Sequence, residues 1–217
     1  MKKSNRLKDL YIGLLYAFII IGIVGASYMY GTGKPNKKVV KQIEAEAHQK
    51  DLDKILALGL VQPEFMYNNA NSFIDATGKC VEYLNFTTDR YSRVPTSIII
   101  AMAGIESAWG SSRFSVEGNN IFGIRTWDLT TDHMKPKEVP DAKFGLKKYK
   151  TKCDSVKDMI RILNTHQAYT EFRVERNSQV KQGRWNYKTL LPLLSAWSTN
   201  PDYAKIILST INERELP

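Results

Sequence analysis

The sequence predicts a mainly α-helical protein that is preceded by one transmembrane helix and contains a short stretch of β-strand. Three observations lead to this fold class. An uncharged apolar run occupies residues 10–30, several later segments repeat apolar residues at helical spacing, and residues 143–149 alternate loosely, as a short strand does. The apolar fraction of 43% is enough for a hydrophobic core, which excludes a disordered chain.

The apolar run at residues 10–30 matches the ~20 residues that a helix needs to cross a bilayer. A cleaved signal peptide is the competing interpretation, with a weak small-residue site at residues 24–26. The run continues past that site into bulky residues 28–30, which favours an uncleaved signal anchor. We therefore expect a cytoplasmic basic tail at residues 1–9 and a lipid-bilayer span at residues 10–30. Lysines flank the run on both sides, so the positive-inside rule supports this orientation only mildly.

The next segments predict a linker and then helices. Residues 31–38 are polar and rich in helix breakers, as linkers are. Residues 39–58 and about 64–85 repeat apolar side chains at helical spacing, and Gly78 predicts an interruption of the second helix. We expect these helices to form an N-terminal helical region over residues 39–88.

Charge and cysteine content narrow the classes of partner. The net charge of +9 and the isoelectric point near 9.4 indicate anionic surroundings: nucleic acid, lipid head groups or an acidic wall polymer. The two cysteines, Cys80 and Cys153, allow one disulfide, but two independent buried thiols fit the sequence equally well. Neither the cysteines nor the three histidines have metal-ligand spacing, so we expect no metal site and no cofactor.

The stretch at residues 96–110 predicts an apolar helix that carries one carboxylate, Glu106, near its end. Pro95 suits the start of this helix and Gly110 suits its end. One buried stripe is expected, formed by Ile98, Met102, Ile105 and Trp109. Glu106 falls beside this stripe, and an apolar wall raises the pKa of a carboxyl group, as a general acid requires. A glutamate on the surface of a helix is the competing interpretation.

The remaining segments have recognisable boundaries. Residues 111–120 predict a loop, and Ser155 with Asp158 has the spacing of a capping box at the start of a helix. Residues 184–197 predict a helical segment, and residues 200–202 predict the start of a C-terminal helix.

Three motifs carry a resemblance to a known family. They are Glu106-Ser107-Ala108-Trp109-Gly110, Asn119-Asn120-Ile121-Phe122-Gly123-Ile124 and Tyr203-Ala204-Lys205-Ile206-Ile207. With them, the chain resembles the glucosaminidase family of peptidoglycan hydrolases, glycoside hydrolase family 73, and within it the Bax-like bacterial proteins most. The resemblance implies a mainly α (α+β lysozyme-like) fold with a small β-hairpin lobe, in a glucosaminidase domain at residues 89–217.

The resemblance also implies catalytic residues. Glu106 corresponds to the general acid of the family, and Tyr203 to a tyrosine that reaches the catalytic cleft and hydrogen-bonds the substrate or steadies charge in the transition state. Some family members place a second acidic residue in the β-lobe, where Glu138 and Asp141 are the candidates. We favour Glu138 narrowly, and two solvated loop acids remain the alternative.

Substrate-binding residues are implied in the same way: Trp109, Asn120, Phe122 and Gly123. Asparagine can hydrogen-bond sugar hydroxyls or N-acetyl groups, and a phenyl ring can stack on a pyranose. Without the family motif, Asn120 would be interpreted as a turn residue and Phe122 as a core aromatic. His166 is expected to be structural or to lie at the cleft rim, because no nucleophile motif adjoins it.

The implied function is hydrolysis of the β-1,4 bond after N-acetylglucosamine in peptidoglycan glycan strands. The enzyme would sit on the cytoplasmic membrane with its catalytic domain on the outer side. A lytic transglycosylase and a non-catalytic wall-binding scaffold are the rival functions. Nucleic acid is not expected as a partner because the basic residues are dispersed, and the oligomeric state stays open.

Overall fold

The computed structural model describes residues 3–33, 37–137, 139 and 141–217. By its internal contacts the chain divides into two compact units, Met1–Gln49 and Lys50–Pro217. The predicted boundary at residues 88 and 89 falls inside the second unit, where helix α3 (Ala70–Thr87) packs with helix α4 (Thr96–Ser107).

The first unit is helical. Helix α1 spans Lys3–Gly33, and its part Lys8–Gly31 has a mean hydropathy of 2.2 over the best window, with none of that window buried. By length and composition this helix suits a membrane span. Helix α2, Lys37–Ala57, begins in the first unit and matches the predicted helix at residues 39–58.

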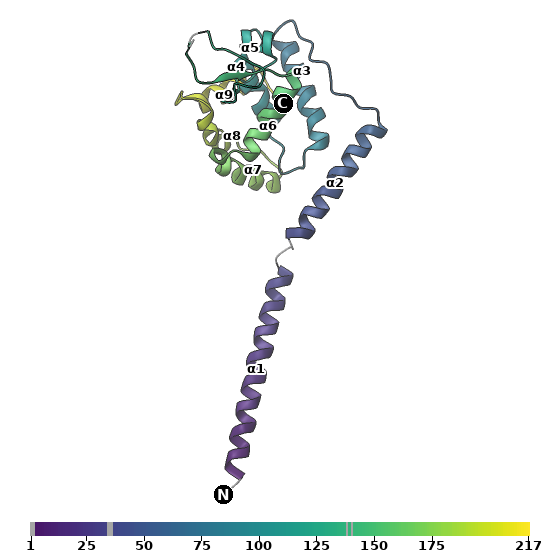
Figure 1. The fold of residues 1–217 in the computed structure, drawn as a ribbon, viewed down its shortest axis with the longest axis vertical. Coiled ribbons are helices and arrows are strands. Elements are labelled where there is room, and N and C mark those ends of the chain that lie inside the picture. The colour runs from purple at the N-terminus through teal and green to yellow at the C-terminus, as the bar shows by residue number, and fades with distance from the viewer. Residues whose placement is uncertain (1–2, 34–36, 138, 140) are drawn as a thin grey trace. The chain divides into compact units, whose positions relative to one another are not determined.

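The second unit contains helices and one small sheet (Figure 1). Its helical elements are α3 (Ala70–Thr87), α4 (Thr96–Ser107), α5 (Arg113–Gly118), α6 (Lys152–Thr165), the 3₁₀ helix η1 (Gln167–Tyr169), α7 (Thr170–Gln182), α8 (Tyr187–Leu190), the 3₁₀ helix η2 (Leu191–Trp197) and α9 (Tyr203–Glu213). The predicted segment at residues 184–197 is thus α8 followed by η2.

Helix α4 is the core of this unit. It packs against α3 and α9, and every residue from Ser97 to Gly104 is buried. The single buried stripe predicted for this helix is therefore wrong, because neighbours cover it on all sides over two turns. A fully apolar helix of this kind is expected in the interior of a domain.

The small sheet is antiparallel and has three strands in the order β1-β3-β2. Strand β1 is Arg125–Thr126, β2 is His133–Met134 and β3 is Gly145–Lys147, inside the predicted strand at residues 143–149. Gly145 is required here because a Cβ atom would overlap the His133 ring on the neighbouring strand. The predicted class, mainly α with a small β lobe, is confirmed.

Helix α3 differs from the predicted helix at residues 64–85 in where it starts and in its continuity at Gly78. It begins at Ala70, where Asn69 and Ser72 form a reciprocal capping box, and Gly78 does not interrupt it. Packing explains the continuity, since Phe73 and Cys80 on either side of Gly78 are fully buried. Burial of these side chains outweighs the ~1 kcal/mol that glycine costs in a helix.

Two further boundaries were wrong. Residues 111–120 contain helix α5, which Ser112 caps through its side chain. Helix α6 starts one turn before the predicted capping box, because Thr151 and Asp154 form the box instead. Ser155 is then buried and its Oγ accepts a hydrogen bond from the Ile121 N–H at 3.2 Å. Helix α7 had no counterpart in the sequence prediction.

A disulfide joins Cys80 of α3 to Cys153 of α6, with 5.5 Å between the Cα atoms. Both residues are buried. Of the two alternatives that the sequence left open, the structure has the bridged one.

Candidate active site

The end of helix α4 is a strained turn that starts two residues after Glu106. Ala108, Trp109 and Gly110 all have positive φ, at 49°, 55° and 84°. The helix therefore ends before the predicted Gly110, with Ala108 as a left-handed C-cap. Left-handed backbone is unfavourable for residues other than glycine, and such strain persists only where the surroundings hold it.

Ser107 holds this turn from within. Its Oγ donates to the carbonyl of Ala103 at 2.6 Å and accepts from the N–H of Gly110 at 2.8 Å. The backbone adds two bonds, from Trp109 N to Gly104 O at 2.9 Å and from Ser112 N to Ser107 O at 2.8 Å. The Glu-Ser-x-Trp-Gly motif is thus a structural unit that fixes the backbone next to Glu106.

Trp109 folds back over its own helix. A Cβ atom at Gly104 would lie 2.5 Å from the Trp109 ring, so only glycine fits beneath the indole. Phe73 meets the ring edge-on at 6.3 Å, and the Arg214 guanidinium lies 4.9 Å from its centroid. The half-buried Trp109 ring is thus packed against Gly104, Phe73 and Arg214. Its role in substrate binding stays a prediction.

Glu106 is half-buried, and burial raises the pKa of its carboxyl group above the ordinary value of 4.5. Hydrogen bonds from Tyr203 and Trp197 act in the opposite direction without cancelling the rise. The Tyr203 hydroxyl donates to Glu106 Oε1 at 2.7 Å. A carboxyl group of this kind stays protonated to higher pH and has donors ready for its anion, which suits proton donation to a leaving group.

Tyr203 reaches Glu106 because it is the first residue of α9, which packs against α4. Tyr203 is 3% exposed, and burial together with the Glu106 carboxylate raises the pKa of its phenol. The phenol therefore keeps its proton and remains a hydrogen-bond donor. The structure thus brings together two residues singled out by separate motifs.

Sequence reasoning missed Trp197, which ends η2 and hydrogen-bonds the Glu106 side chain. It ends the leucine-rich segment at residues 184–197, for which the sequence predicts only a helix. The useful signal was its place just before the turn that leads into Tyr203 and α9. An indole is a donor only, so it can stabilise the ionised form of Glu106.

Asn120 ties the turn after α5 to the sheet. Its Nδ2 donates to Ile124 O at 2.9 Å and to Lys147 O at 3.0 Å, and its Oδ1 accepts from Ile124 N at 3.0 Å. Phe122 is 1% exposed and belongs to the core, whereas Gly123 has positive φ and open space beside its Cα. The burial of Asn120 and Phe122 supports a role in shaping this turn, and their contact with substrate stays a prediction.

Three residues considered in the sequence analysis remain: Glu138 and Asp141, the candidates for a second catalytic carboxylate, and His166. Glu138 lies outside the described residues, and Asp141 is exposed before β3. His166 is exposed and caps η1, where its Nδ1 accepts from the Ala168 N–H at 3.2 Å. Within the described ranges, no group of three or more potential metal ligands occurs.

The fold is similar to the crystal structure of the catalytic domain of the autolysin Auto from Listeria monocytogenes. The TM-score is 0.53 at 22% identity, over 77% of this chain and 94% of that domain. This likeness shows the fold, a lysozyme-like one, in which the central helix α4 carries the half-buried Glu106 near its end.

The particular family follows from the sequence comparison. The family model described as Glucosaminidase, mannosyl-glycoprotein endo-beta-N-acetylglucosaminidase, matches residues 86–216, more than half of the chain. The chain belongs to this glucosaminidase family. The resemblance drawn from the three motifs is confirmed, and with it the assignment to the glycoside hydrolases.

Two curated relatives are similar over part of their length. Protein bax of Escherichia coli (strain K12) is 33% identical over 94 residues, covering 42% of this chain and 32% of bax. Exo-glucosaminidase LytG of Bacillus subtilis (strain 168) is 27% identical over 136 residues, covering 59% of this chain and 46% of LytG. The chain therefore matches less than half of the length of either relative.

Proposed function

We propose that this protein is a membrane-anchored peptidoglycan hydrolase that cleaves the β-1,4 bond after N-acetylglucosamine, with Glu106 as its general acid. The observation that carries the proposal is the half-buried Glu106 carboxyl, whose pKa burial raises, held at 2.7 Å by the Tyr203 hydroxyl. The family description names an endo enzyme and LytG is named an exo enzyme. We propose the endo mode, because the family match covers most of this domain whereas LytG is similar over less than half of its own length.

In the proposed mechanism, neutral Glu106 protonates the glycosidic oxygen as the bond to the sugar breaks and an oxocarbenium-like centre develops. The proton leaves a carboxylate, which the Tyr203 hydroxyl and the Trp197 indole stabilise by hydrogen bonds. Water then attacks the sugar, helped by a second carboxylate, for which Glu138 is our candidate, or by the substrate's own acetamido group. The open side of Gly123 would let a sugar approach the backbone closely.

The proposed location is the outer face of the cytoplasmic membrane, with α1 as a signal anchor. Helix α1 has the length and apolar composition of a span. The Cys80–Cys153 disulfide supports an outward-facing domain, because disulfides form and persist in oxidising compartments. The net charge of +9 would hold the domain near an acidic wall polymer.

The test is digestion of purified peptidoglycan by the full-length chain in detergent, beside its Glu106→Gln variant. Glutamine keeps the size of the side chain but cannot donate the proton, so we expect the rate to fall at least ~100-fold. Glu171→Gln is the matched control, since Glu171 is exposed in the first turn of α7. Products would be reduced and identified by mass spectrometry.

The products separate the candidate functions. Reducing-end N-acetylglucosamine from the wild type and the Glu171→Gln variant alone would support a glucosaminidase with Glu106 as its acid. Anhydro ends would identify a lytic transglycosylase instead. Binding of glycan without cleavage by wild type or variants would identify a non-catalytic scaffold.

A further inference from the structure

The strained turn after Glu106 is supported from outside as well as from within. Positive φ at Ala108 and Trp109 is unfavourable for residues other than glycine, so the turn needs partners that keep it in place. Ser107 supplies the internal bonds. The external bond comes from Tyr67, whose hydroxyl donates to the carbonyl oxygen of Gly110 at 2.8 Å.

Tyr67 also packs directly against this turn. A Cβ atom at Gly110 would lie 2.5 Å from Tyr67 Cε2 and 2.7 Å from Phe73 Cδ2. Gly110 is therefore constrained twice, by its φ of 84° and by the close approach of these two rings. The Tyr67 ring and hydroxyl act on the same peptide, four residues after Glu106.

The Tyr67 ring is itself held on three sides. Phe65 and Phe73 meet it edge-on at 5.7 Å and 5.3 Å between centroids. Lys152 Nζ lies 5.5 Å from the ring centroid and donates to Asn119 Oδ1 at 3.0 Å. Aromatic pairs and a partly desolvated cation over a ring are favourable contacts, so the Tyr67 hydroxyl is presented by a fixed side chain.

This support comes from a segment that the family match does not include. Tyr67 lies in the irregular stretch between α2 and α3, whereas the matched residues are 86–216. Gln62, in the same stretch, donates through Nε2 to Thr151 Oγ1 at the start of α6. The stretch before α3 is thus attached both to the turn after α4 and to the start of α6, within the same unit.

We infer that Tyr67 is a positioning residue for Glu106: its hydroxyl braces the left-handed turn that ends α4 and so fixes the direction of the catalytic carboxyl. The inference rests on the proposed function of Glu106 as general acid. It deepens that function, because it places part of the catalytic support in the stretch that leads into the domain from α2.

The test compares full-length wild type with Tyr67→Phe in detergent, with soluble glycan strands as substrate. Phenylalanine keeps the ring and removes only the hydroxyl bond to Gly110. We expect kcat to fall about tenfold, equivalent to about 1.4 kcal/mol, and KM to change less than kcat, since the lost hydroxyl bond acts on the turn and not on the substrate. Tyr83→Phe is the matched control, because Tyr83 is half-buried on α3 and its hydroxyl makes no hydrogen bond among the described residues.

A second readout follows the turn without requiring activity. Protein labelled with 5-fluorotryptophan gives ¹⁹F resonances for the four tryptophans. Phe substitution of Trp127, Trp185 and Trp197, one at a time, assigns three of them and leaves Trp109 as the fourth. We expect Tyr67→Phe to shift the Trp109 resonance, because Trp109 is inside the braced turn. Tyr83→Phe should leave it in place.

The outcomes separate the two proposals. An inactive wild type would refute the proposed function, while the Trp109 resonance would still test the brace. An active wild type with unchanged kcat and an unmoved Trp109 resonance in Tyr67→Phe would overturn the inference. Rates are compared well below each variant's melting temperature, so loss of folded protein does not imitate loss of kcat.

Discussion

Ala108 is where the strain beside the candidate acid can be measured most directly. It is exposed and has φ 49° and ψ 52°, a left-handed conformation that alanine adopts only at a cost. Ala108→Gly should therefore raise the free energy of unfolding by about 1 kcal/mol, even though glycine adds entropy to the unfolded chain. Urea denaturation checks this.

Ala168→Gly is the matched control, since Ala168 is exposed in η1 and is not among the residues with positive φ. This variant should lose about 0.5–1 kcal/mol. Equal losses for both variants would mean that the backbone at Ala108 is not left-handed in solution.

Single residues also mark the limit of prediction from sequence. Glu106 and Tyr203 could be proposed because each lies in a short motif, and their contact follows from the packing of α9 on α4. Trp197 could not be proposed, because it lies in none of the three motifs and ends a segment that the sequence predicts only as a helix. Likewise, nothing in the spacing of Tyr67 and Gly110 indicates that they touch.

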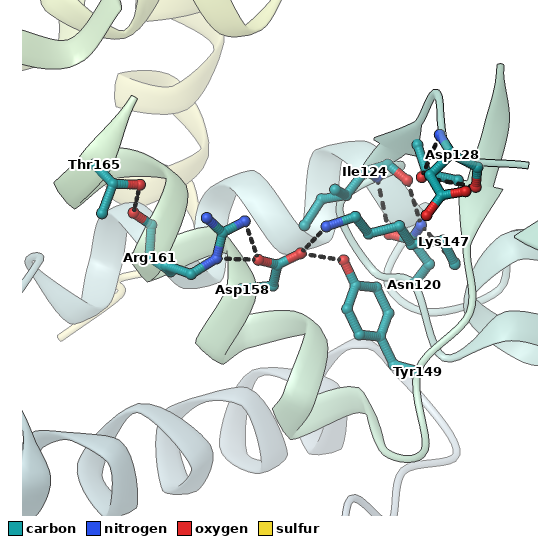
Figure 2. Close-up of polar contacts among 9 residues, drawn as sticks. Asn120, Ile124, Asp128, Lys147, Tyr149, Asp158, Arg161 and Thr165 are labelled. Atoms are coloured by element: carbon teal, nitrogen blue, oxygen red, sulfur yellow. Dashed lines mark hydrogen bonds and ion pairs between the residues drawn. The ribbon is translucent and has the colours of Figure 1, made fainter. Parts of the chain in front are cut away.

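At the scale of elements, Asp158 connects helix α6 to the sheet (Figure 2). Its Oδ2 accepts from Lys147 Nζ of β3 at 2.8 Å and from the Tyr149 hydroxyl at 2.7 Å. Its Oδ1 accepts from Arg161 Nε at 2.7 Å. Lys147 also holds Asn120 through its carbonyl oxygen, so this cluster extends to the turn that contains Gly123.

Asp158→Asn removes the charge that this cluster shares. We expect a loss of about 2 kcal/mol, between the values typical of exposed and buried pairs, because the Asp158 side chain is 12% exposed while Lys147 and Arg161 are 33% and 56% exposed. Denaturation at neutral pH measures the loss. Asp132→Asn is the control, since Asp132 pairs with Lys148 at 2.9 Å but is 75% exposed, and it should change stability by less than ~0.5 kcal/mol.

The same variant has a defined pH dependence. Burial raises the pKa of Asp158, but hydrogen bonds from Lys147, Tyr149 and Arg161 outweigh it and hold the pKa below the ordinary 3.8. A depressed carboxyl pKa stabilises the fold above the unfolded-state value and loses that effect as the pH falls through the folded-state value. The deficit of Asp158→Asn should therefore be constant near neutrality and shrink below about pH 4. A deficit that grew on acidification would contradict this assignment.

The start of helix α6 shows why the sequence predicts a helix in the right place but with the wrong first residue. Two pairs near the start of α6 have capping-box spacing, Thr151 with Asp154 and Ser155 with Asp158. Local chemistry does not choose between them. The choice comes from tertiary contacts, since Ser155 bonds Ile121 and Asp158 bonds β3.

At the scale of the whole molecule, composition and periodicity predicted the class, and the motifs predicted the family. The pairing of Cys80 with Cys153 could not be predicted, because it depends on how α3 packs against α6. The sheet order β1-β3-β2 has the same origin, since strands this short carry little pattern.

The disulfide closes a loop that contains the proposed general acid. The loop it closes spans 73 residues and contains helix α4 with Glu106, the turn at Asn120 and all three strands. Closing a loop of this length lowers the entropy of the unfolded chain by the equivalent of about 4 kcal/mol at 25 °C. The bridge therefore stabilises the part of the domain in which the turn after Glu106 holds its strain.

The double variant Cys80→Ala/Cys153→Ala should consequently lose about 4 kcal/mol of unfolding free energy. Urea denaturation of the full-length chain in detergent measures the loss. Wild type denatured and refolded with reductant should match the double variant, and wild type without reductant should not. Because both sulfurs are buried, reductant should act only after the domain opens, so its effect at low urea should be slow. Coincident curves for oxidised wild type and the double variant would show that the bridge is absent or adds nothing.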